Sequence, residues 1–404
     1  MYLCPVKIGL IQERKNPPDN RVPLTPNQAA AFKTRFPDVD IVAEASPTRC
    51  FSDAEYQAVG IHIQTDMTDC DVLLGVKEVP VEALIPNKTY MFFSHTIKAQ
   101  EYNRTLLQTI LKKNIRLIDY EVINWDNGQR VLGFGHWAGI VGAYNGILTY
   151  GLKSGDFNLK PANQCQDFDE MIQEGLKVKL KPIKIVVSGT GRVGKGSIEV
   201  MEKLKIKKVS PQDFLSQTYD EAVYTHLDNS DLFARKDREE WDNQHFYANH
   251  SQYQSQFEVF YKNTDVLIHG IYWENDMPQL FTKEDTLKPE FRINVIADIT
   301  CDIDGSIPIT FKDTSISEPI IYWDSSLQKS AKSSSKNTID IMAVGNLPNE
   351  LPRDASTTFG EKMLDFCLPA LIEGGKSILT NGTMTKNGKL TDRYAYLQDF
   401  VEGE

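Results

Sequence analysis

Several features that mark membrane or nucleic-acid-binding proteins are missing from this sequence. No apolar run reaches the roughly 18 residues of a membrane-spanning helix. The apolar stretch in "MYLCPVKIGLIQERK" is too short and too soon interrupted for a signal peptide. A net charge of -11 gives no basic surface for nucleic acid. We therefore expect a cytoplasmic protein with small-molecule partners, for which homo-oligomerisation stays open.

Cysteine is scarce and its spacing forms no pattern. The sequence has six cysteines and no CxxC: Cys4, Cys50, Cys70, Cys165, Cys301 and Cys367. In a chain of 404 residues this favours reduced thiols over a disulfide framework or a zinc site. We expect no metal. The length itself is typical of two or three domains.

Short apolar runs alternate with helical stretches in the first part of the chain. Strands are predicted at Val6–Ile11, Ile41–Ala43, Val72–Val76, Met91–Ser94 and Leu117–Asp119. Helices are predicted at Asn27–Arg35, with Thr25 as N-cap and Pro26 at the first position, and at Ala99–Lys113. This alternation predicts an α/β fold with a doubly wound parallel sheet.

A second α/β unit is expected after a long Gly- and Ala-rich helix, "GHWAGIVGAYNGILTYGL". Residues 154–182 have the polar, irregular composition of a hairpin or linker, and 327–337 that of a loop. Residues 218–258 form an insertion without a functional interpretation. The remaining predicted elements are strands at Ile183–Ser188, Val266–His269, Val295–Asp298 and Ile339–Val344, and a helix at Ala355–Glu373.

The stretch "KIVVSGTGRVGKGSIEVMEKL" predicts a dinucleotide site, because its GxGxxG lies between a strand and a helix. Gly189 would make the tight turn, Gly191 would admit a pyrophosphate, and Gly194 would allow close helix–strand packing. The alternative is a tight turn without a ligand. Further cofactor contacts are expected from Arg192, Val193, Ser210, Ile268 and Asp298.

The second strand of such a unit usually ends in an acid that binds the adenosine ribose. Here its end is predicted at Val209-Ser210, after three lysines, Lys205, Lys207 and Lys208. Asp213 comes too late. The missing acid favours NADPH slightly over NADH as the NAD(P)(H) cofactor.

Polar residues follow several predicted strands, where ligands of open α/β sheets bind. Lys77 follows one strand and His95 the next, while Arg21 follows the first; Asp298 and Asp302 end a strand of the second unit. Buried Lys and His can exchange protons near neutral pH, as reductive amination requires. Arg21 can bind a carboxylate in bidentate fashion. His95 as a structural residue is the alternative, and Glu78 and Glu121 are either site residues or solvated side chains.

At these residues the sequence resembles the lysine–2-oxoglutarate reductase, or saccharopine dehydrogenase (L-lysine-forming), branch of the alanine dehydrogenase and transhydrogenase family. The matching stretches include "RVPLTP", "LLGVKEVP", "YMFFSHTIKAQ", "GFGHWAGIVGAYNGI", "GTGRVGKGS", "LIHGIYWE", "DITCDIDGSI" and "GNLPNELPRDASTTFG". "FFSHTIKAQ" and "NLPNELPRDAS" are the stretches most specific for this branch.

The resemblance implies two Rossmann-like doubly wound parallel-sheet domains with a cleft between them. Residues 1–137 plus 345–404 would form the substrate domain and 138–344 the dinucleotide-binding domain. The implied reaction combines lysine, 2-oxoglutarate and NAD(P)H into saccharopine. Lys77 and His95 match the family's catalytic pair, Arg21 its substrate-carboxylate arginine, and Asp302 its aspartate near the nicotinamide.

The sequence departs from the family pattern at two points, and two rival functions are also considered. Gly345 stands where many relatives have an acid, and no stretch matches the second dehydrogenase fused in animal and plant relatives, whose activity we expect in another protein. The rivals are a sister amino-acid or opine dehydrogenase of the alanine dehydrogenase type and a non-catalytic nucleotide sensor. Retention of Lys77 and His95 argues against the sensor.

Overall fold

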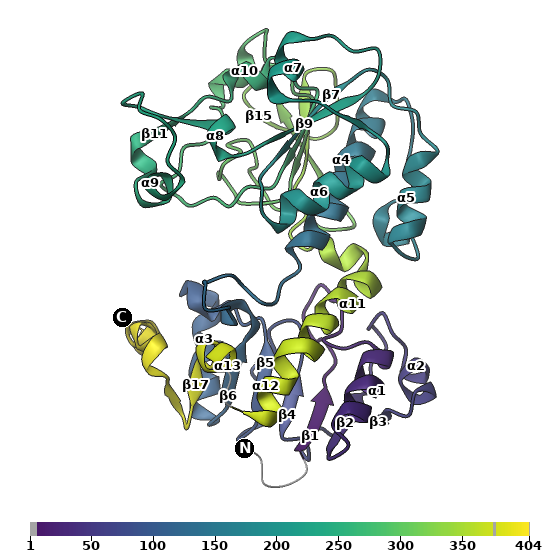
Figure 1. Cartoon of the computed structure of the whole chain (residues 1–404), viewed down its shortest axis with the longest axis vertical. Helices are drawn as coiled ribbons and strands as arrows, with labels where there is room; N and C mark the ends of the chain where they lie inside the picture. The colour runs from purple at the N-terminus through teal and green to yellow at the C-terminus, as the bar shows by residue number, and fades with distance from the viewer. Residues whose placement is uncertain (1–5, 375–376, 404) are drawn as a thin grey trace. The chain divides into compact units, whose positions relative to one another are not determined.

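A computed structural model describes residues 6–374 and 377–403, and its contacts divide the chain into two units (Figure 1). One unit contains Met1–Phe134 and Pro352–Glu404, and the other contains Gly135–Leu351. The sequence suggests boundaries at 137/138 and 344/345. Cys4 lies outside the described residues, and no disulfide joins the five cysteines within them.

The terminal unit is built on a six-stranded parallel sheet in the order β3-β2-β1-β4-β5-β6. This is the doubly wound order. Successive strands are added on one side of β1 up to β3 and on its other side from β4 onward. The strands are β1 (Val6–Leu10), β2 (Val39–Glu44), β3 (His62–Gln64), β4 (Val72–Leu74), β5 (Thr89–Phe92) and β6 (Arg116–Asp119).

Helices cover both faces of this sheet. One hydrophobic core packs against α1, α11 and α12, and the opposite core packs against α3 and α14. Thr25 caps α1 with a reciprocal bond from Gln28, as the N-terminal motif predicts. The helices are α1 (Pro26–Arg35), α2 (Asp53–Ala58), α3 (Glu101–Lys112), α11 (Pro352–Lys362), α12 (Leu368–Glu373), α13 (Ser377–Gly382) and α14 (Gln398–Glu402). The smaller elements are 3₁₀ segments η1 (Thr96–Lys98), η2 (Tyr120–Val122) and η8 (Asp392–Leu397), π segment η7 (Met363–Cys367), and hairpin strands β17 (Thr385–Lys386) and β18 (Lys389–Leu390).

The middle unit carries an eight-stranded sheet in the order β15-β14-β16-β13-β12-β7-β9-β8. The strands from β16 to β8 are parallel, whereas β14 and β15 form an antiparallel edge. The strands are β7 (Lys184–Ser188), β8 (Lys207–Lys208), β9 (Val223–Leu227), β12 (Val266–His269), β13 (Val295–Asp298), β14 (Ile320–Asp324), β15 (Lys329–Ala331) and β16 (Thr338–Met342).

Helices α4 (Gly135–Ser154) and α6 (Arg192–Lys203) pack closely against one another in this unit (Figure 1). A Cβ on Gly139 would lie 1.9 Å from the carbonyl oxygen of Val193, and one on Gly196 would lie 2.0 Å from that of His136. Glycine is therefore required at the contact. The other helices are α5 (Phe168–Leu176), α7 (Pro211–Ser216), α8 (Asn229–Leu232), α9 (Asn243–Ala248) and α10 (Glu258–Tyr261).

Two predicted irregular segments are wrong. Residues 154–182 contain the nine-residue helix α5, which Asp167 caps, and residues 327–337 contain strand β15. Both elements carry many charged and polar residues, so their composition hides them. Residues 218–258 contain β9, the helices α8 and α9, and a small antiparallel pair, β10 (Phe233–Arg235) and β11 (Tyr253–Ser255).

Short 3₁₀ segments complete the middle unit: η3 (Ala162–Gln164), η4 (His250–Gln252), η5 (Glu284–Leu287) and η6 (Leu347–Glu350). Within the described ranges, no helix combines the length and the apolar character that a bilayer crossing demands.

Candidate functional site

The carboxyl edge of the terminal unit's sheet gathers the polar residues that the sequence singles out. Arg21 follows β1, Lys77 follows β4, His95 follows β5, and Glu121 follows β6. Because these strands are parallel, their carboxyl ends share one edge. Three of these strands are nevertheless shorter at the carboxyl end than predicted, since β1 ends at Leu10, β4 at Leu74 and β5 at Phe92.

His95 lies between two carboxylates at this edge. Its Nδ1 is 3.3 Å from Glu121 and its Nε2 is 3.8 Å from Glu78. Each carboxylate also has a cation: Lys15 lies 2.9 Å from Glu78 and Arg130 lies 3.2 Å from Glu121. The imidazole is thus flanked by two carboxylates, each of which also faces a cation.

Glu121 stays ionised although it is nearly buried. Burial raises the pKa of its carboxyl, but the hydrogen bond from His95 and the positive charges of His95 and Arg130 outweigh burial, and the net pKa is below its usual value. Asp119 lies beneath and accepts bonds from the Glu121 N–H at 2.8 Å and from the Ser94 N–H at 3.2 Å. It thereby joins the segment carrying Glu121 to the segment carrying His95.

His95 adopts a left-handed backbone conformation with φ of 55°. Such a conformation is uncommon for residues other than glycine. Asn103 of α3 donates a hydrogen bond to the His95 carbonyl oxygen at 3.3 Å, and the His95 ring stacks on Phe93. These contacts hold the imidazole between its carboxylates.

Lys77 is half-buried, and desolvation, followed by the charge of Arg21, lowers the pKa of its amine. Its backbone is held by a residue that the sequence analysis missed. Glu13 accepts the N–H of Val76 at 2.6 Å and the N–H of Lys77 at 2.9 Å. No local motif marks Glu13, because its partners lie more than 60 positions away in the chain.

Arg21 is buried and forms a bidentate ion pair with Asp19. Nε lies 2.9 Å from Oδ1 and Nη2 lies 2.6 Å from Oδ2, and the guanidinium lies over the Phe134 ring at 4.2 Å. The Nε/Nη2 edge of the guanidinium is thus bound to Asp19. A substrate carboxylate would have to approach another part of the guanidinium or displace Asp19.

In the middle unit, the GxGxxG turn joins β7 to α6 with the geometry its glycines require. Gly189 has φ of 100°, and a Cβ on Gly194 would lie 1.7 Å from the Gly189 carbonyl oxygen. Gly191, the N-cap of α6, differs, because a Cβ there would meet no atom within 4 Å. The N-terminus of α6 is therefore open beside Gly191, where N–H groups and the helix dipole favour an anion. The turn fits a dinucleotide pyrophosphate.

A strand, β8, does end just before the predicted Val209-Ser210, but it is not the strand next to β7. The strand that pairs with β7 is β9, and β8 lies beyond β9 at the sheet edge. Ser210 follows β8 and caps α7, with its hydroxyl bonded to Asp213. Because β8 and α7 lie between α6 and β9, the strand next to β7 comes later in the chain than the usual spacing from the glycine turn predicts. Asp228 follows β9 directly and is the acid at the position that Ser210 was expected to hold.

The other candidate residues of this unit divide between core and surface. Ile268 is fully buried on the sheet face that packs against Gly146 of α4. Asp298 is also buried, where burial raises its pKa to about 6, and it accepts hydroxyl bonds from Thr300 and Thr310, each at 2.6 Å. Neither side chain is open to a cofactor in this structure.

Arg192 and Asp302 are exposed, at the first turn of α6 and after β13, and Val193 is half-buried against Gly270. Gly345 has room for a side chain, because the nearest atoms to an added Cβ are Asp313 Oδ2 at 3.9 Å and Cys301 Sγ at 4.0 Å. The glycine there is thus not a steric requirement.

Comparisons with known proteins place these two units in a family. The description "Alanine dehydrogenase/PNT, N-terminal domain" matches residues 9–141, and "Alanine dehydrogenase/PNT, C-terminal domain" matches residues 163–393. The chain belongs to the alanine dehydrogenase/PNT family. A solved L-alanine dehydrogenase has the same fold, with a TM-score of 0.67 at 17% identity, covering 98% of this chain and 99% of that chain.

Two curated relatives are similar over nearly the whole chain. The mitochondrial alpha-aminoadipic semialdehyde synthase of Rattus norvegicus is 32% identical over 98% of this chain and 48% of its own length. The chain thus spans about half the length of that relative. The saccharopine dehydrogenase [NAD(+), L-lysine-forming] of Yarrowia lipolytica is 25% identical over 92% of both chains.

Proposed function

We propose that this member of the alanine dehydrogenase/PNT family is a nicotinamide-dependent oxidoreductase that forms or oxidises saccharopine. The observation that carries the proposal is that Lys77 and His95 lie at one sheet edge, where His95 has two carboxylate partners. The name of the Yarrowia lipolytica relative, which includes saccharopine, NAD(+) and L-lysine, supports this choice of substrates.

The reaction joins the side-chain amine of L-lysine to the C2 carbonyl of 2-oxoglutarate. The amine adds to the carbonyl to give a carbinolamine, which loses water to give an imine, and each step moves protons on nitrogen and oxygen. A reduced nicotinamide supplies the hydride that converts the imine into the secondary amine of saccharopine.

Lys77 would exchange protons with the carbinolamine oxygen and the imine nitrogen. Its lowered pKa supports this role, because an acid–base group works best when its pKa is near the working pH. His95 would exchange the proton of the secondary amine with Glu78 or Glu121, its carboxylate neighbours. Arg21 would supply positive charge for a substrate carboxylate, and Asp302 would act near the nicotinamide.

We propose NADH rather than NADPH as the preferred cofactor. The expected preference for NADPH assumes that Ser210 ends the strand next to β7. The strand next to β7 is instead β9, and Ser210 caps α7. Asp228 follows β9, where a carboxylate can accept the ribose hydroxyls and would repel a 2′-phosphate. Gly191 and the open N-terminus of α6 would receive the pyrophosphate.

The test measures NADH oxidation with L-lysine and 2-oxoglutarate, and in parallel with ammonia and pyruvate. We expect turnover with the first pair and little with the second. Replacing Lys77 or His95 with Met should lower kcat by roughly 10²–10⁴-fold while NADH binding persists, since general acid–base catalysis contributes that much.

Each alternative has a distinct outcome in this assay. Faster turnover of pyruvate and ammonia would assign the chain to an alanine dehydrogenase activity. NADH binding without turnover of either pair would indicate a nucleotide sensor. Near-normal kcat in both the Lys77→Met and His95→Met variants would overturn the assignment of the catalytic pair.

A further inference from the structure

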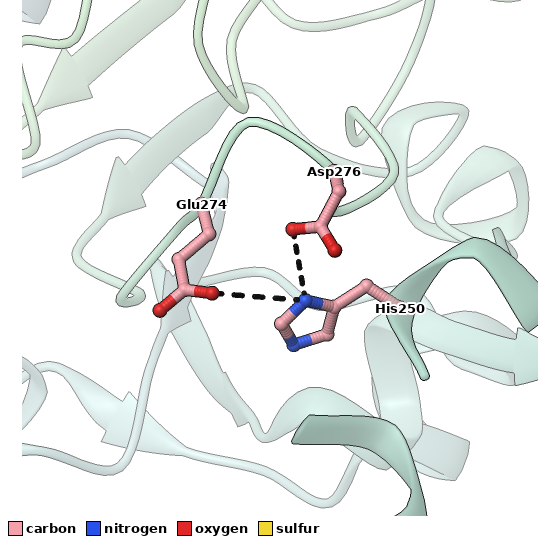
Figure 2. Close-up of side chains that lie close together, drawn as sticks. All are labelled: His250, Glu274 and Asp276. Carbon is pink, nitrogen blue, oxygen red and sulfur yellow. Dashed lines mark hydrogen bonds and ion pairs between the residues drawn. The ribbon is translucent and has the colours of Figure 1, made fainter. Parts of the chain in front are cut away.

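A second cluster of ligand-type side chains lies in the middle unit, away from the glycine turn in sequence. It contains His250, which begins η4, and Glu274 and Asp276, which lie in the loop after β12 (Figure 2). Nδ1 of His250 is 3.1 Å from Asp276 Oδ1 and 3.9 Å from Glu274 Oε2. The three ligand atoms all lie within 4.8 Å of one another.

The nitrogen of this cluster is fixed and the oxygens are adjustable. The His250 side chain is 3% exposed, and its ring packs edge-on against Phe246 with centroids 5.1 Å apart. The Glu274 and Asp276 side chains are 48% and 66% exposed. Tyr272 donates a hydrogen bond to Glu274 Oε1 at 2.7 Å, which leaves Oε2 directed at the imidazole (Figure 2).

The negative charge of the cluster is only partly balanced. Across the ranges the structure describes, neither Glu274 nor Asp276 forms an ion pair with a lysine or arginine. One imidazole carries at most one positive charge and faces two carboxylates. A proton on Nδ1 can be donated to Asp276 at 3.1 Å, whereas Glu274 Oε2 lies at 3.9 Å from the same nitrogen, beyond hydrogen-bond distance.

We propose that His250 Nδ1, Glu274 Oε2 and Asp276 Oδ1 bind one divalent transition-metal cation, for which Zn²⁺ is the best fit. Zn²⁺ binds imidazole nitrogen and carboxylate oxygen at about 2.0–2.2 Å, usually with four ligands. The two exposed carboxylates need only small rotations to reach such distances. An imidazole ligand disfavours Mg²⁺ and Ca²⁺, which prefer oxygen.

The surroundings suit a three-ligand site with water as the fourth ligand. His250 and Asp276 line a hollow of about 470 Å³, which gives water access to the cation. Binding through Nδ1 places the ring proton on Nε2, which is buried and has no hydrogen-bond partner within the described chain. Nε2 lacks a partner in either tautomer, so metal binding adds no further unsatisfied group.

The site would give the insertion at 218–258 a structural role. His250 belongs to that insertion, whereas Glu274 and Asp276 belong to the loop that starts at Gly270. The carbonyl oxygen of Gly270 lies against the glycine turn, 2.5 Å from where a Cβ on Gly189 would be. A cation would therefore join the insertion to the loop beside the turn.

The experiment measures Zn²⁺ binding by competition with a chromophoric chelator, using the full chain after treatment with EDTA. The variant is Glu274→Gln/Asp276→Asn, which changes two exposed side chains and leaves the buried histidine in place. The matched control is Glu239→Gln/Glu240→Gln, which removes the same charge from exposed residues of the same insertion. Any Zn²⁺ bound by other residues contributes equally to the wild type, the variant and the control, so only the difference between them reports on this site.

We expect the wild type and the control to bind one more equivalent of Zn²⁺ than the Glu274→Gln/Asp276→Asn variant, or to bind it more tightly by at least the roughly 10–100-fold that even a partner of a metal ligand contributes. Zn²⁺ should also raise the Tm of the wild type and the control more than that of the variant, since a ligand stabilises the state that binds it. Equal binding and equal Tm shifts in all three proteins would overturn the proposal. Equal occupancy by Mg²⁺ would overturn the nitrogen-ligated site.

Discussion

Glu13 accepts a hydrogen bond from the main-chain N–H of Lys77 at 2.9 Å. The same carboxyl group accepts the N–H of Val76 at 2.6 Å, so both of its oxygens hold the segment that leaves β4. Burial, followed by the charge of Asp19, raises the pKa of Glu13 to about 8. A costly buried acid is thus kept next to the proposed acid–base lysine, which indicates a positioning role.

Glu13→Gln should lower kcat by about fivefold, because the amide loses one of the two acceptors and a hydrogen bond of about 1 kcal/mol. The NADH dissociation constant should change little, since the glycine turn belongs to the other unit. Steady-state kinetics with L-lysine and 2-oxoglutarate, together with NADH titration, measure these effects.

A double variant separates positioning from general damage. If Glu13 acts through Lys77, adding Glu13→Gln to Lys77→Met should cost almost nothing further in kcat, because the effects of coupled residues are not additive. Independent, additive losses would contradict the positioning role.

Cofactor preference depends on which strand pairs with β7. Asp228→Asn keeps a side chain that can cap α8 but removes the charge, and we expect it to lower kcat/KM for NADH by about 10–100-fold, the value of a hydrogen bond to a charged group. Its effect on NADPH should be smaller or favourable, because the repulsion of the 2′-phosphate is lost.

Ser210→Asp is the matched control for that prediction. Asp also caps helices, so α7 should persist, and the added charge lies beyond β9 at the sheet edge. The ratio of kcat/KM for NADH to that for NADPH should stay as in the wild type. If Ser210→Asp changed this ratio and Asp228→Asn did not, the residue that binds the adenosine ribose would follow β8 and not β9.

The parts of the fold that were predicted correctly are those with strong local signals. The motif "LTPNQ" contains the cap of α1, and the glycines of "GTGRVG" are required by backbone contacts at Gly189 and Gly194. Polar elements escaped prediction. Strand β15 is stabilised by pairing with β14, and helix α5 by its Asp167 cap and by the packing of Gly175 against Leu204; amino-acid composition alone does not reveal these contacts.

The candidate site was predicted in part for the same reason. Lys77 and His95 interrupt apolar runs and are therefore conspicuous in the sequence. Glu13, Asp119 and Asp228 act through partners or strands that only the tertiary structure brings near. The spacing from the glycine turn predicts Ser210, but β8 and α7 precede β9 in the chain, so the strand next to β7 ends later than that spacing implies.

The glycines of the turn should separate into structural and cofactor-binding positions. Gly194→Ala would place a Cβ 1.7 Å from the Gly189 carbonyl oxygen, and we expect a large fall in Tm from overpacking. The Cβ of Gly191→Ala would meet no atom within 4 Å, so the free energy of unfolding should fall by at most ~1 kcal/mol, the cost of a poorer N-cap. NADH affinity should nonetheless fall, because the methyl group would meet the pyrophosphate. Full NADH affinity in Gly191→Ala would remove this turn from the proposed site.

Glu350 should make stability depend on pH. Its carboxyl is 4% exposed, and burial raises its pKa to about 7 despite hydrogen bonds from Asn145 and the Asn163 backbone. An unfolded glutamate releases its proton near pH 4.5. Between these values the folded protein holds a proton that the unfolded chain has lost. The stabilisation from this group is therefore complete below about pH 4.5 and is lost as the pH rises through 7.

Glu350→Gln removes this titration while keeping an acceptor for Asn145. The variant loses the acceptor for the Asn163 N–H at every pH, so only the change with pH is diagnostic. Relative to the wild type, we expect its stability to improve between pH 5 and pH 8 by up to about 3 kcal/mol, from roughly 1.4 kcal/mol per pKa unit. Thermal melts of wild type, Glu350→Gln and the exposed control Glu290→Gln at both pH values measure the difference. A Tm difference between wild type and Glu350→Gln that is constant with pH would show that Glu350 is ionised in the folded protein throughout this range.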